Sequence, residues 1–156
     1  PDNELAELFK PVLAAHGVNL QTFSDDYIAH VVGLVKGRIS FVKDLWEQAR
    51  FFFVAPDSYA EKDIKKRWKP ETPQIMEELI EVLEKTPDFS SKPCEEFVLG
   101  WIAEKGYHLG NVMNAFRLTV VGECKGPHMF DITELIGREE TISRIRKGVA
   151  AIKPVE

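Results

Sequence analysis

The sequence predicts an all-α protein built from two small helical subdomains. Three observations support this prediction. Apolar residues recur three and four positions apart in almost every segment, which is the spacing of one helix face. Capping residues and glycines separate these segments where helices would begin and end. Alternating strand patterns are absent, although residues 118–121 alone could form a strand.

The first half of the chain is expected to hold several helices. The apolar face over residues 5–13 contains Pro11, and an interior proline costs about 3 kcal/mol, so a kink or a break is expected there. Ser24 can cap the next helix, which has two aspartates in its first turn, where acids suit the helix dipole. After Gly37 a further helix is expected over residues 41–53.

Two features near the middle of the chain have both a structural and an RNA-binding interpretation. A helix can bury at most two of the three consecutive phenylalanines 51–53 on one face, so one ring should be left over. That ring could pack on a neighbouring subdomain, which we favour, or lie exposed for a base. The basic run at 62–69 contains Trp68 and is either a solvated helix face anchored by one aromatic, which we favour, or an RNA-facing patch.

The second half has clearer helix boundaries. Thr72 followed by proline is a strong start for a helix that lasts to about Lys85. Residues 86–93 include two prolines and two serines and form the best linker candidate, so we place the subdomains at 1–88 and 89–156. Further helices are expected over 95–105, through 112–120, and over 130–136 and 139–152, with glycines at the ends of the first three.

Composition limits the possible functions. The net charge of −5 argues against a protein that binds nucleic acid by bulk charge, but a small local RNA contact remains possible. Cys94 and Cys124 are too few for a disulfide framework and indicate free thiols in a reducing compartment. No segment is apolar enough to span a membrane, and the acidic N-terminus does not read as a signal peptide. A cytoplasmic protein without a membrane partner is expected.

No catalytic signature is present in the chain. GxSxG, HExxH and P-loop patterns are absent, and the four histidines have no cysteine or carboxylate at metal-ligand spacing. Paired acids such as Glu139-Glu140 are better explained as first-turn residues of helices. We therefore expect no catalytic site, no metal site and no cofactor in this chain.

A long motif in the second half carries a family resemblance. Residues 103–122 read AEKGYHLGNVMNAFRLTVVG, and residues 126–140 read GPHMFDITELIGREE. These stretches resemble the C-terminal anticodon-binding region of bacterial-type glutamyl-tRNA synthetases, which are class I aminoacyl-tRNA synthetases. The segment from Leu34 to Phe53 shares the family's order of a basic helix ending in aromatic residues. The motif's length and order make it far more specific than a lone glycine loop.

The resemblance implies a function that periodicity alone does not indicate. In that family two helical units form an α-helix cage that receives the anticodon loop, here that of tRNA(Glu). The glutamate–tRNA ligase reaction, with ATP and Mg, belongs to an N-terminal catalytic domain, whose HIGH-like and KMSKS-like motifs do not occur in this chain. We therefore expect a monomeric piece of a longer ligase, with that domain as its partner. The alternative is a helical protein–protein interaction module without RNA binding.

The resemblance also implies which residues contact the anticodon: Arg38, Asn114, Arg117, Gly126, Pro127 and Met129. Arg117 matches a family arginine at the anticodon, and a planar guanidinium can stack on an unpaired base and donate hydrogen bonds to it. The structural alternative is a surface arginine paired with an acid such as Glu123. Arg38 matches the arginine that meets the last anticodon base and favours cytosine there.

The loop over residues 125–129 matches the family loop that lies against the first and middle anticodon bases. Met129 could offer an adaptable apolar surface to a base, and Asn114 stands where the family often has glutamine. Three residues depart from the family pattern. Ala115 replaces a proline, while Val121 and Gly126 replace residues with hydroxyls, which shifts base recognition toward backbone groups.

Overall fold

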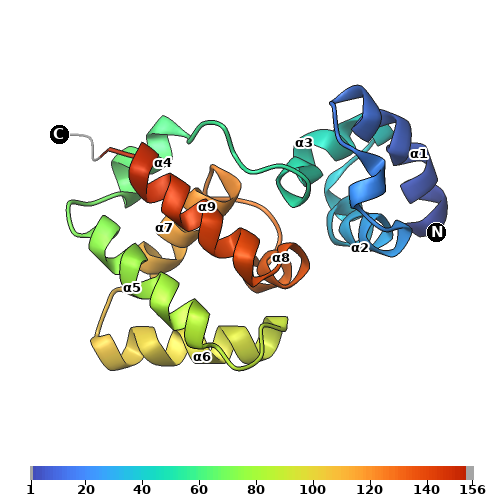
Figure 1. The fold of residues 1–156 in the computed structure, drawn as a ribbon. Helices are drawn as coiled ribbons and strands as arrows, with labels where there is room; N and C mark the ends of the chain where they lie inside the picture. Colours follow the sequence, from blue (N-terminus) through green and yellow to red (C-terminus); the bar gives the residue numbers. More distant parts are fainter. Residues whose placement is uncertain (1, 154–156) are drawn as a thin grey trace. The chain divides into compact units, whose positions relative to one another are not determined.

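The computed structural model describes residues 2–153, and all regular structure within that range is helical (Figure 1). It consists of nine α-helices and four short 3-10 turns across those residues. The all-α prediction is therefore confirmed. The chain divides into two compact units, Pro1–Val54 and Ala55–Glu156. No helix formed by residues 2–153 has both the length and the apolar character needed to cross a membrane.

The first unit is built on two packed helices, α1 (Asp2–Ala15) and α2 (Asp25–Val35). Ser24 caps α2 as expected, because its hydroxyl accepts a hydrogen bond from the backbone N–H of Tyr27 at 3.0 Å. The expected break at Pro11 does not occur. This residue lies on the exposed side of α1, and the helix continues through it to Ala15.

The prediction of one continuous helix over residues 41–53 is wrong. This segment forms three short pieces instead: η3 (Val42–Asp44), α3 (Leu45–Ala49) and η4 (Arg50–Phe52). Phe41 precedes them in an extended conformation, with φ −132° and ψ 152°, and its side chain is 65% exposed rather than part of an apolar face.

Phe51, Phe52 and Phe53 are 6%, 2% and 8% exposed, so all three rings are buried. The limit of two buried rings is therefore wrong, and the favoured packed position of the third ring, rather than an exposed one, is what the structure shows. The change from the α3 helix to the tighter η4 turn changes the directions of the three side chains. Phe51 and Phe52 contact each other at 4.7 Å between ring centroids, while Phe53 packs edge-on against Phe23 at 5.0 Å and Tyr27 at 5.7 Å.

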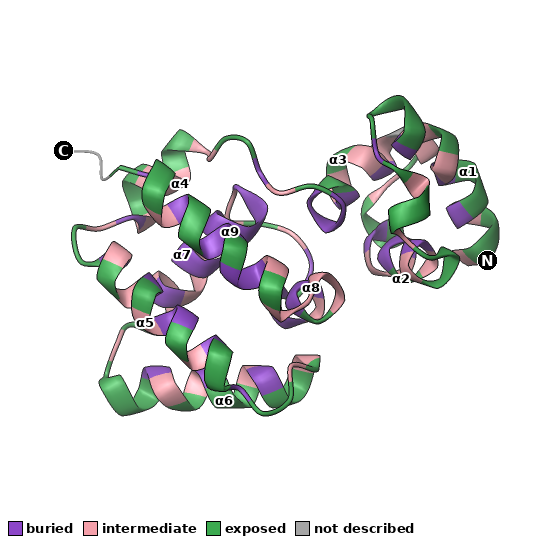
Figure 2. Ribbon diagram, viewed as in Figure 1, coloured by how far each residue is buried: buried purple, intermediate pink, exposed green. Residues whose placement is uncertain are grey.

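The second unit is built around one buried helix. Its elements are α4 (Glu61–Arg67), α5 (Thr72–Lys85), α6 (Ser91–Lys105), α7 (Leu109–Val121), α8 (Met129–Ile136) and α9 (Arg138–Ala151). Helices α4, α5, α6 and α9 all pack against α7, which is strongly buried in Figure 2. Gly106 and Gly122 follow α6 and α7 with positive φ, and Gly137 ends α8, so the three predicted glycine ends are confirmed.

The boundary between the units lies after Val54, whereas the predicted subdomains were 1–88 and 89–156. The physical reason is that α5, which precedes residue 88, packs on α7 and α9 of the second unit. The segment expected to be a linker is also fixed within that unit. Arg138 donates a hydrogen bond to the carbonyl of Thr86, and the Ser91 hydroxyl donates to Asp131 at 2.7 Å.

Candidate nucleic-acid interface

The candidate interface in the second unit lies at the end of α7 and in the turn that leads to α8. We call residues 122–128 the α7–α8 turn. Arg117 projects from the third turn of α7, and its Nη1 donates to the carbonyl oxygen of Pro127 at 2.8 Å. The structure thus brings together two parts of the predicted site, the arginine of the helix and the loop ten residues further along.

Gly122 allows the chain to turn sharply where α7 ends. Its φ of +94° is in the left-handed region, and its N–H donates to the carbonyl of Leu118 at 2.9 Å. A Cβ atom at this position would lie 2.9 Å from both the Pro56 Cβ and the Ser58 carbonyl oxygen. Glycine is therefore required here both by the backbone conformation and by the close approach of the segment before α4.

Two hydrogen bonds hold the α7–α8 turn against the region around α4. The backbone N–H of Ala60 donates to the carbonyl of Gly122 at 2.9 Å. The backbone N–H of Cys124 donates to Oδ2 of Asp63 at 3.0 Å. The position of the turn, and with it the Pro127 carbonyl, is therefore set by residues about sixty positions earlier in the chain.

Asn114 lies one turn before Arg117 on α7, so the two side chains share a side of the helix. Its side-chain Nδ2 donates to the carbonyl of Gly110 at 2.7 Å, and its own backbone carbonyl accepts from the Cys124 thiol at 3.5 Å. Asn114 is partly exposed. The structure thus places it next to the α7–α8 turn, with one of its side-chain donors bonded within the helix.

The loop residues are less exposed than the sequence interpretation assumed. Met129 is 2% exposed and begins α8 with its side chain in the core, so the apolar surface expected from it is not available in this conformation. Pro127 is also buried and presents its carbonyl to Arg117. Gly126 is partly exposed and has φ +131°, a conformation that residues with a side chain rarely adopt. These three loop residues therefore present little side-chain surface to a base.

Arg38 belongs to the first unit, so the group around Arg117 forms without it. Arg38 ends the short turn η2 (Lys36–Arg38) and is exposed. The preceding helix end is fixed by an ion pair at 2.6 Å between Lys36 and Asp2, the first residue of α1.

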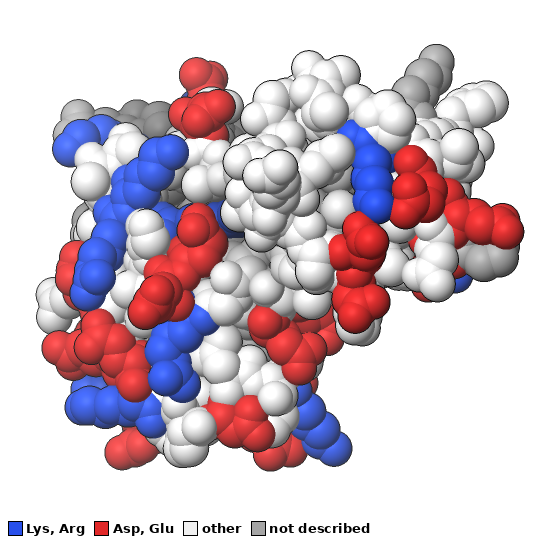
Figure 3. Space-filling model, turned by 45° about the vertical axis from the view of Figure 1, so that its right-hand side comes forward, with Lys and Arg blue, Asp and Glu red and all other residues white. Residues whose placement is uncertain are grey.

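Charges near the α7–α8 turn act on the Cys124 thiol. Burial raises the pKa of this thiol to about 11; Asp63 raises it further, while Arg67 and Arg117 lower it. The thiol is therefore protonated at neutral pH and serves as a weak hydrogen-bond donor. Elsewhere on the second unit, basic and acidic side chains are interspersed on the face that Figure 3 shows.

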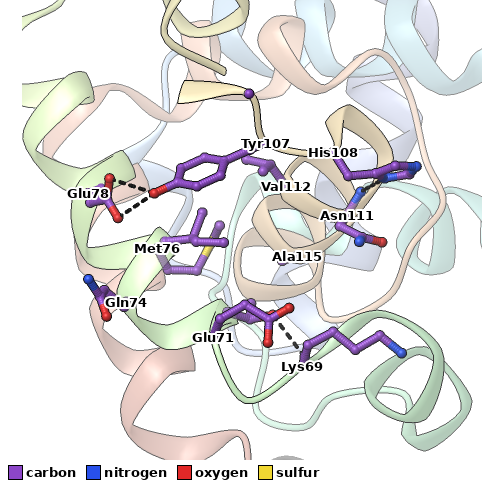
Figure 4. Close-up of a pocket in the computed structure, with 13 residues that line it drawn as sticks. Lys69, Glu71, Gln74, Met76, Glu78, Tyr107, His108, Asn111, Val112 and Ala115 are labelled. Carbon is purple, nitrogen blue, oxygen red and sulfur yellow. Dashed lines mark hydrogen bonds between the residues drawn. The ribbon is translucent and has the colours of Figure 1, made fainter. Parts of the chain in front are cut away.

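The α5–α7 cavity, of about 370 Å³, lies on another side of α7 (Figure 4). Tyr107 points across it, and its hydroxyl lies 2.9 and 3.0 Å from the two carboxylate oxygens of Glu78. At its edge the His108 ring accepts the backbone N–H of Asn111 at 3.1 Å. None of the six residues predicted to contact an anticodon lines this cavity.

The described part of the chain contains no group of three or more His, Cys, Asp or Glu residues placed to hold a metal ion. Most of the basic run at 62–69 lies in α4, and Trp68, directly after this helix, is 2% exposed. The structural interpretation of Trp68 as a core anchor is therefore confirmed.

Sequence reasoning missed Asp63 as the residue that holds the α7–α8 turn. The only available signal was its spacing of four residues from Arg67, which places both on one side of α4. Nothing in the sequence linked that side of α4 to Cys124.

Comparisons with known proteins agree on one family. The family model described as anticodon binding domain matches residues 4–149. A glutamate–tRNA ligase of Phocaeicola vulgatus is 55% identical over 152 residues, which is 97% of this chain and 30% of that protein. One from Flavobacterium psychrophilum is 47% identical over 151 residues, which is 97% of this chain and 29% of that protein. The chain thus spans about 30% of the length of the curated relatives it matches.

Solved structures give the same result. A crystal structure of a glutamate tRNA ligase from Elizabethkingia meningosepticum in complex with its amino acid has a TM-score of 0.88 and 42% sequence identity. The match covers 98% of the present chain and 30% of the ligase chain. A glutamate–tRNA synthetase structure from Elizabethkingia anophelis has a TM-score of 0.82 and 39% identity, covering 97% of this chain and 29% of that one.

Proposed function

The chain belongs to the anticodon binding domain family, and from this premise we propose that it recognises the anticodon loop of tRNA(Glu). In this proposal the chain is the anticodon-binding part of a glutamate–tRNA ligase, as its relatives are glutamate–tRNA ligases. ATP, Mg and glutamate bind a catalytic domain elsewhere in the longer protein. The longer protein works in the cytoplasm as a monomer. The present chain supplies recognition and no step of the ligation chemistry.

The observation that carries this proposal is the 2.8 Å hydrogen bond from Arg117 Nη1 to the Pro127 carbonyl. It holds a planar guanidinium beside a turn whose own position is fixed by Asp63 and Gly122. A guanidinium held in this way can stack on an unpaired base and donate hydrogen bonds along the base edge. Because the arginine is anchored before the RNA arrives, less side-chain entropy is lost on binding.

Backbone groups of the α7–α8 turn supply the second part of the recognition. Gly126 has no side chain to keep a base away from the turn, and its φ of +131° favours glycine at this position. Asn114 adds a side-chain amide one helical turn before Arg117. Met129 acts indirectly, because its buried side chain anchors the end of the turn in the core.

Arg38 reads the last anticodon base from the first unit. Its side chain is exposed at the end of η2, and Gly37 beside it has open space where a Cβ would be, so a base could approach the backbone there. A guanidinium on such a corner can donate to the acceptor atoms of cytosine.

The test compares tRNA(Glu) with the same tRNA carrying a different anticodon, using fluorescence anisotropy. We expect tighter binding to tRNA(Glu), and we expect Arg117→Ala and Arg38→Ala each to weaken that binding about 5- to 150-fold, the effect of losing a base contact of about 1–3 kcal/mol. Arg146→Ala is the matched control, because Arg146 is an exposed arginine of α9 paired with Glu84 at 3.3 Å. Its removal changes the net charge equally and should leave the affinity within about twofold.

The proposal fails if both site variants fold normally and keep the wild-type affinity. It also fails if Arg146→Ala weakens binding as much as they do, because the effect would then reflect charge alone. Helical circular dichroism and urea unfolding establish that each variant is folded.

A further inference from the structure

We infer that Arg67 is an additional RNA-binding residue, whose guanidinium contacts a backbone phosphate of the loop that Arg117 reads. The inference rests on the proposed function and extends it to a residue outside the family motif described above. Four observations on α4 and the α7–α8 turn support it.

The first observation is the direction in which one side of α4 faces. Asp63 and Arg67 are four residues apart, so their side chains lie one above the other on the helix. The Asp63 carboxylate accepts the Cys124 N–H at 3.0 Å, which places this side of α4 against the α7–α8 turn. Arg67 therefore projects from the side of α4 that meets this turn.

The second observation is that the end of α4 is fixed. Trp68 follows Arg67 directly and is 2% exposed, and its backbone N–H donates to the carbonyl of Ile64 at 2.9 Å. A buried tryptophan next to Arg67 prevents this last turn from fraying. The arginine thus leaves the helix from a rigid position, which is what a specific contact requires.

The third observation links Arg67 to Arg117. Both guanidiniums act on the Cys124 thiol and favour its charged form, so both lie within electrostatic reach of one sulfur atom. That sulfur is fixed by its 3.5 Å contact with the backbone carbonyl of Asn114. Two arginines from different helices therefore converge on the α7–α8 turn.

The fourth observation is that the Arg67 side chain has no hydrogen bond or ion pair with the groups that the structure describes. The closest acidic side chain on its own helix face, Asp63, bonds to Cys124, and Glu123 of the turn lies 3.9 Å from Lys125. The carboxylates of Asp63 and Glu123 act on the same Cys124 thiol, but neither forms an ion pair with the partly buried Arg67 guanidinium, whose N–H groups can therefore bind a further anion. A phosphate matches it, because guanidinium groups bind phosphate oxygens with two parallel hydrogen bonds.

The lysines of α4 do not share this position. Lys65 lies on the opposite side of the helix from Asp63 and lines a hollow with Ile152 and Lys153 of the chain's C-terminal end. The basic run is therefore not one patch. Lys65 offers a control with the same charge, on the same helix, directed away from the α7–α8 turn.

The experiment measures the affinity of the 156-residue chain for tRNA(Glu) over a range of salt concentrations. Each phosphate contact to single-stranded RNA contributes about 0.7 to the slope of log affinity against log salt. We expect Arg67→Gln to reduce the magnitude of that slope by about 0.7 and to weaken binding several-fold at low salt. Arg67→Lys should keep most of the slope, and Lys65→Gln should leave it unchanged.

A second comparison separates a phosphate contact from a base contact. Phosphate contacts carry no sequence information, so Arg67→Gln should weaken tRNA(Glu) and the anticodon-swapped tRNA by the same factor. Arg117→Ala should weaken mainly the former. If the wild-type chain binds tRNA(Glu) and Arg67→Gln keeps its slope, or if Lys65→Gln lowers the slope equally, the inference is overturned while the proposed function stands. If the wild-type chain does not bind tRNA(Glu), both are overturned.

Discussion

The carboxylate of Asp63 accepts the backbone N–H of Cys124 at 3.0 Å, and this bond replaces one that a longer α7 would make. In a continuing α7 the Cys124 N–H would donate to the carbonyl of Val120, four residues earlier. That carbonyl instead accepts Nη1 of Arg144, a 3% exposed residue of α9, at 3.0 Å. Both halves of the missing helical bond are thus satisfied by side chains from α4 and α9.

Removing the Asp63 side chain should therefore affect stability and recognition together. We expect Asp63→Ala to lower the free energy of unfolding by about 1–3 kcal/mol, because the partly buried Cys124 N–H loses a charged acceptor. We expect the same variant to weaken tRNA(Glu) binding, since the α7–α8 turn loses one of the two hydrogen bonds that hold it against the α4 region. Urea unfolding and fluorescence anisotropy measure the two effects.

Asp63→Asn is the matched variant for this prediction. Its amide oxygen can still accept the Cys124 N–H, so its loss of stability should be clearly smaller than that of Asp63→Ala. Equal losses in the two variants would show that the charge of Asp63, rather than its hydrogen bond to the turn, matters for the fold.

Helix ends were predictable because their signals are local. The Ser24 hydroxyl needs only the N–H three residues later, and Gly122 needs only a backbone that can adopt positive φ. The segment 41–53 was not predictable in the same way. Its apolar residues match a helical spacing, but its conformation follows from packing the rings of Phe51–Phe53 into a small core.

The candidate site shows the same division. Arg117 and the loop that follows α7 stand out in the sequence because they belong to one continuous motif. Asp63 does not, because its partner Cys124 is 61 residues away and the bond depends on how α4 packs on α7. Periodicity shows which face of a helix is apolar, but not which backbone group a polar residue on the other side will meet.

The phenylalanines of the first unit provide a test of the corrected segment 41–53. Phe52 is 2% exposed, and we expect Phe52→Ala to lower the free energy of unfolding by about 3–5 kcal/mol, because it leaves a cavity. Phe41 is 65% exposed, so Phe41→Ala should change it by less than about 0.5 kcal/mol. A continuous helix with both rings on its buried face would instead make the two losses similar. Urea unfolding of the matched pair distinguishes these outcomes.

Close packing of α7 on α9 depends on Gly148. A Cβ atom there would lie 2.6 Å from Cγ2 of Thr119 and 2.9 Å from its Cβ. We expect Gly148→Ala to destabilise the protein by about 1–3 kcal/mol despite alanine's better helix propensity, because the two helices must separate.

Thr119→Ser tests the cause of that loss. Serine keeps the hydroxyl that donates to the Phe116 carbonyl at 2.7 Å but lacks the Cγ2 methyl group. Gly148→Ala combined with Thr119→Ser should therefore be more stable than the sum of the two single losses predicts. Additive losses in a thermal or urea unfolding cycle would rule out the clash as the cause.

Both cysteines should behave as protected thiols in the folded protein. Burial raises the pKa of Cys94 and of Cys124 to about 11, so neither forms appreciable thiolate at pH 8. We expect the folded chain to react with an aromatic disulfide reagent at least tenfold more slowly than the urea-unfolded chain at that pH. Rapid reaction of either thiol in the folded chain would contradict the buried position of Cys94 or the partly buried position of Cys124.

The raised pKa values also predict how stability depends on pH. Between pH 9 and about 11 the unfolded chain loses its thiol protons while the folded chain retains them. The unfolded state then binds fewer protons, so these two groups lower stability as the pH rises through that window. Below pH 9 the contribution of the two thiols to the free energy of unfolding is fully present. The urea midpoint of the wild-type chain should therefore fall more between pH 8 and pH 10 than that of Cys94→Ala combined with Cys124→Ser. Equal falls in the two proteins would show that other groups, such as tyrosines and lysines, account for the entire change.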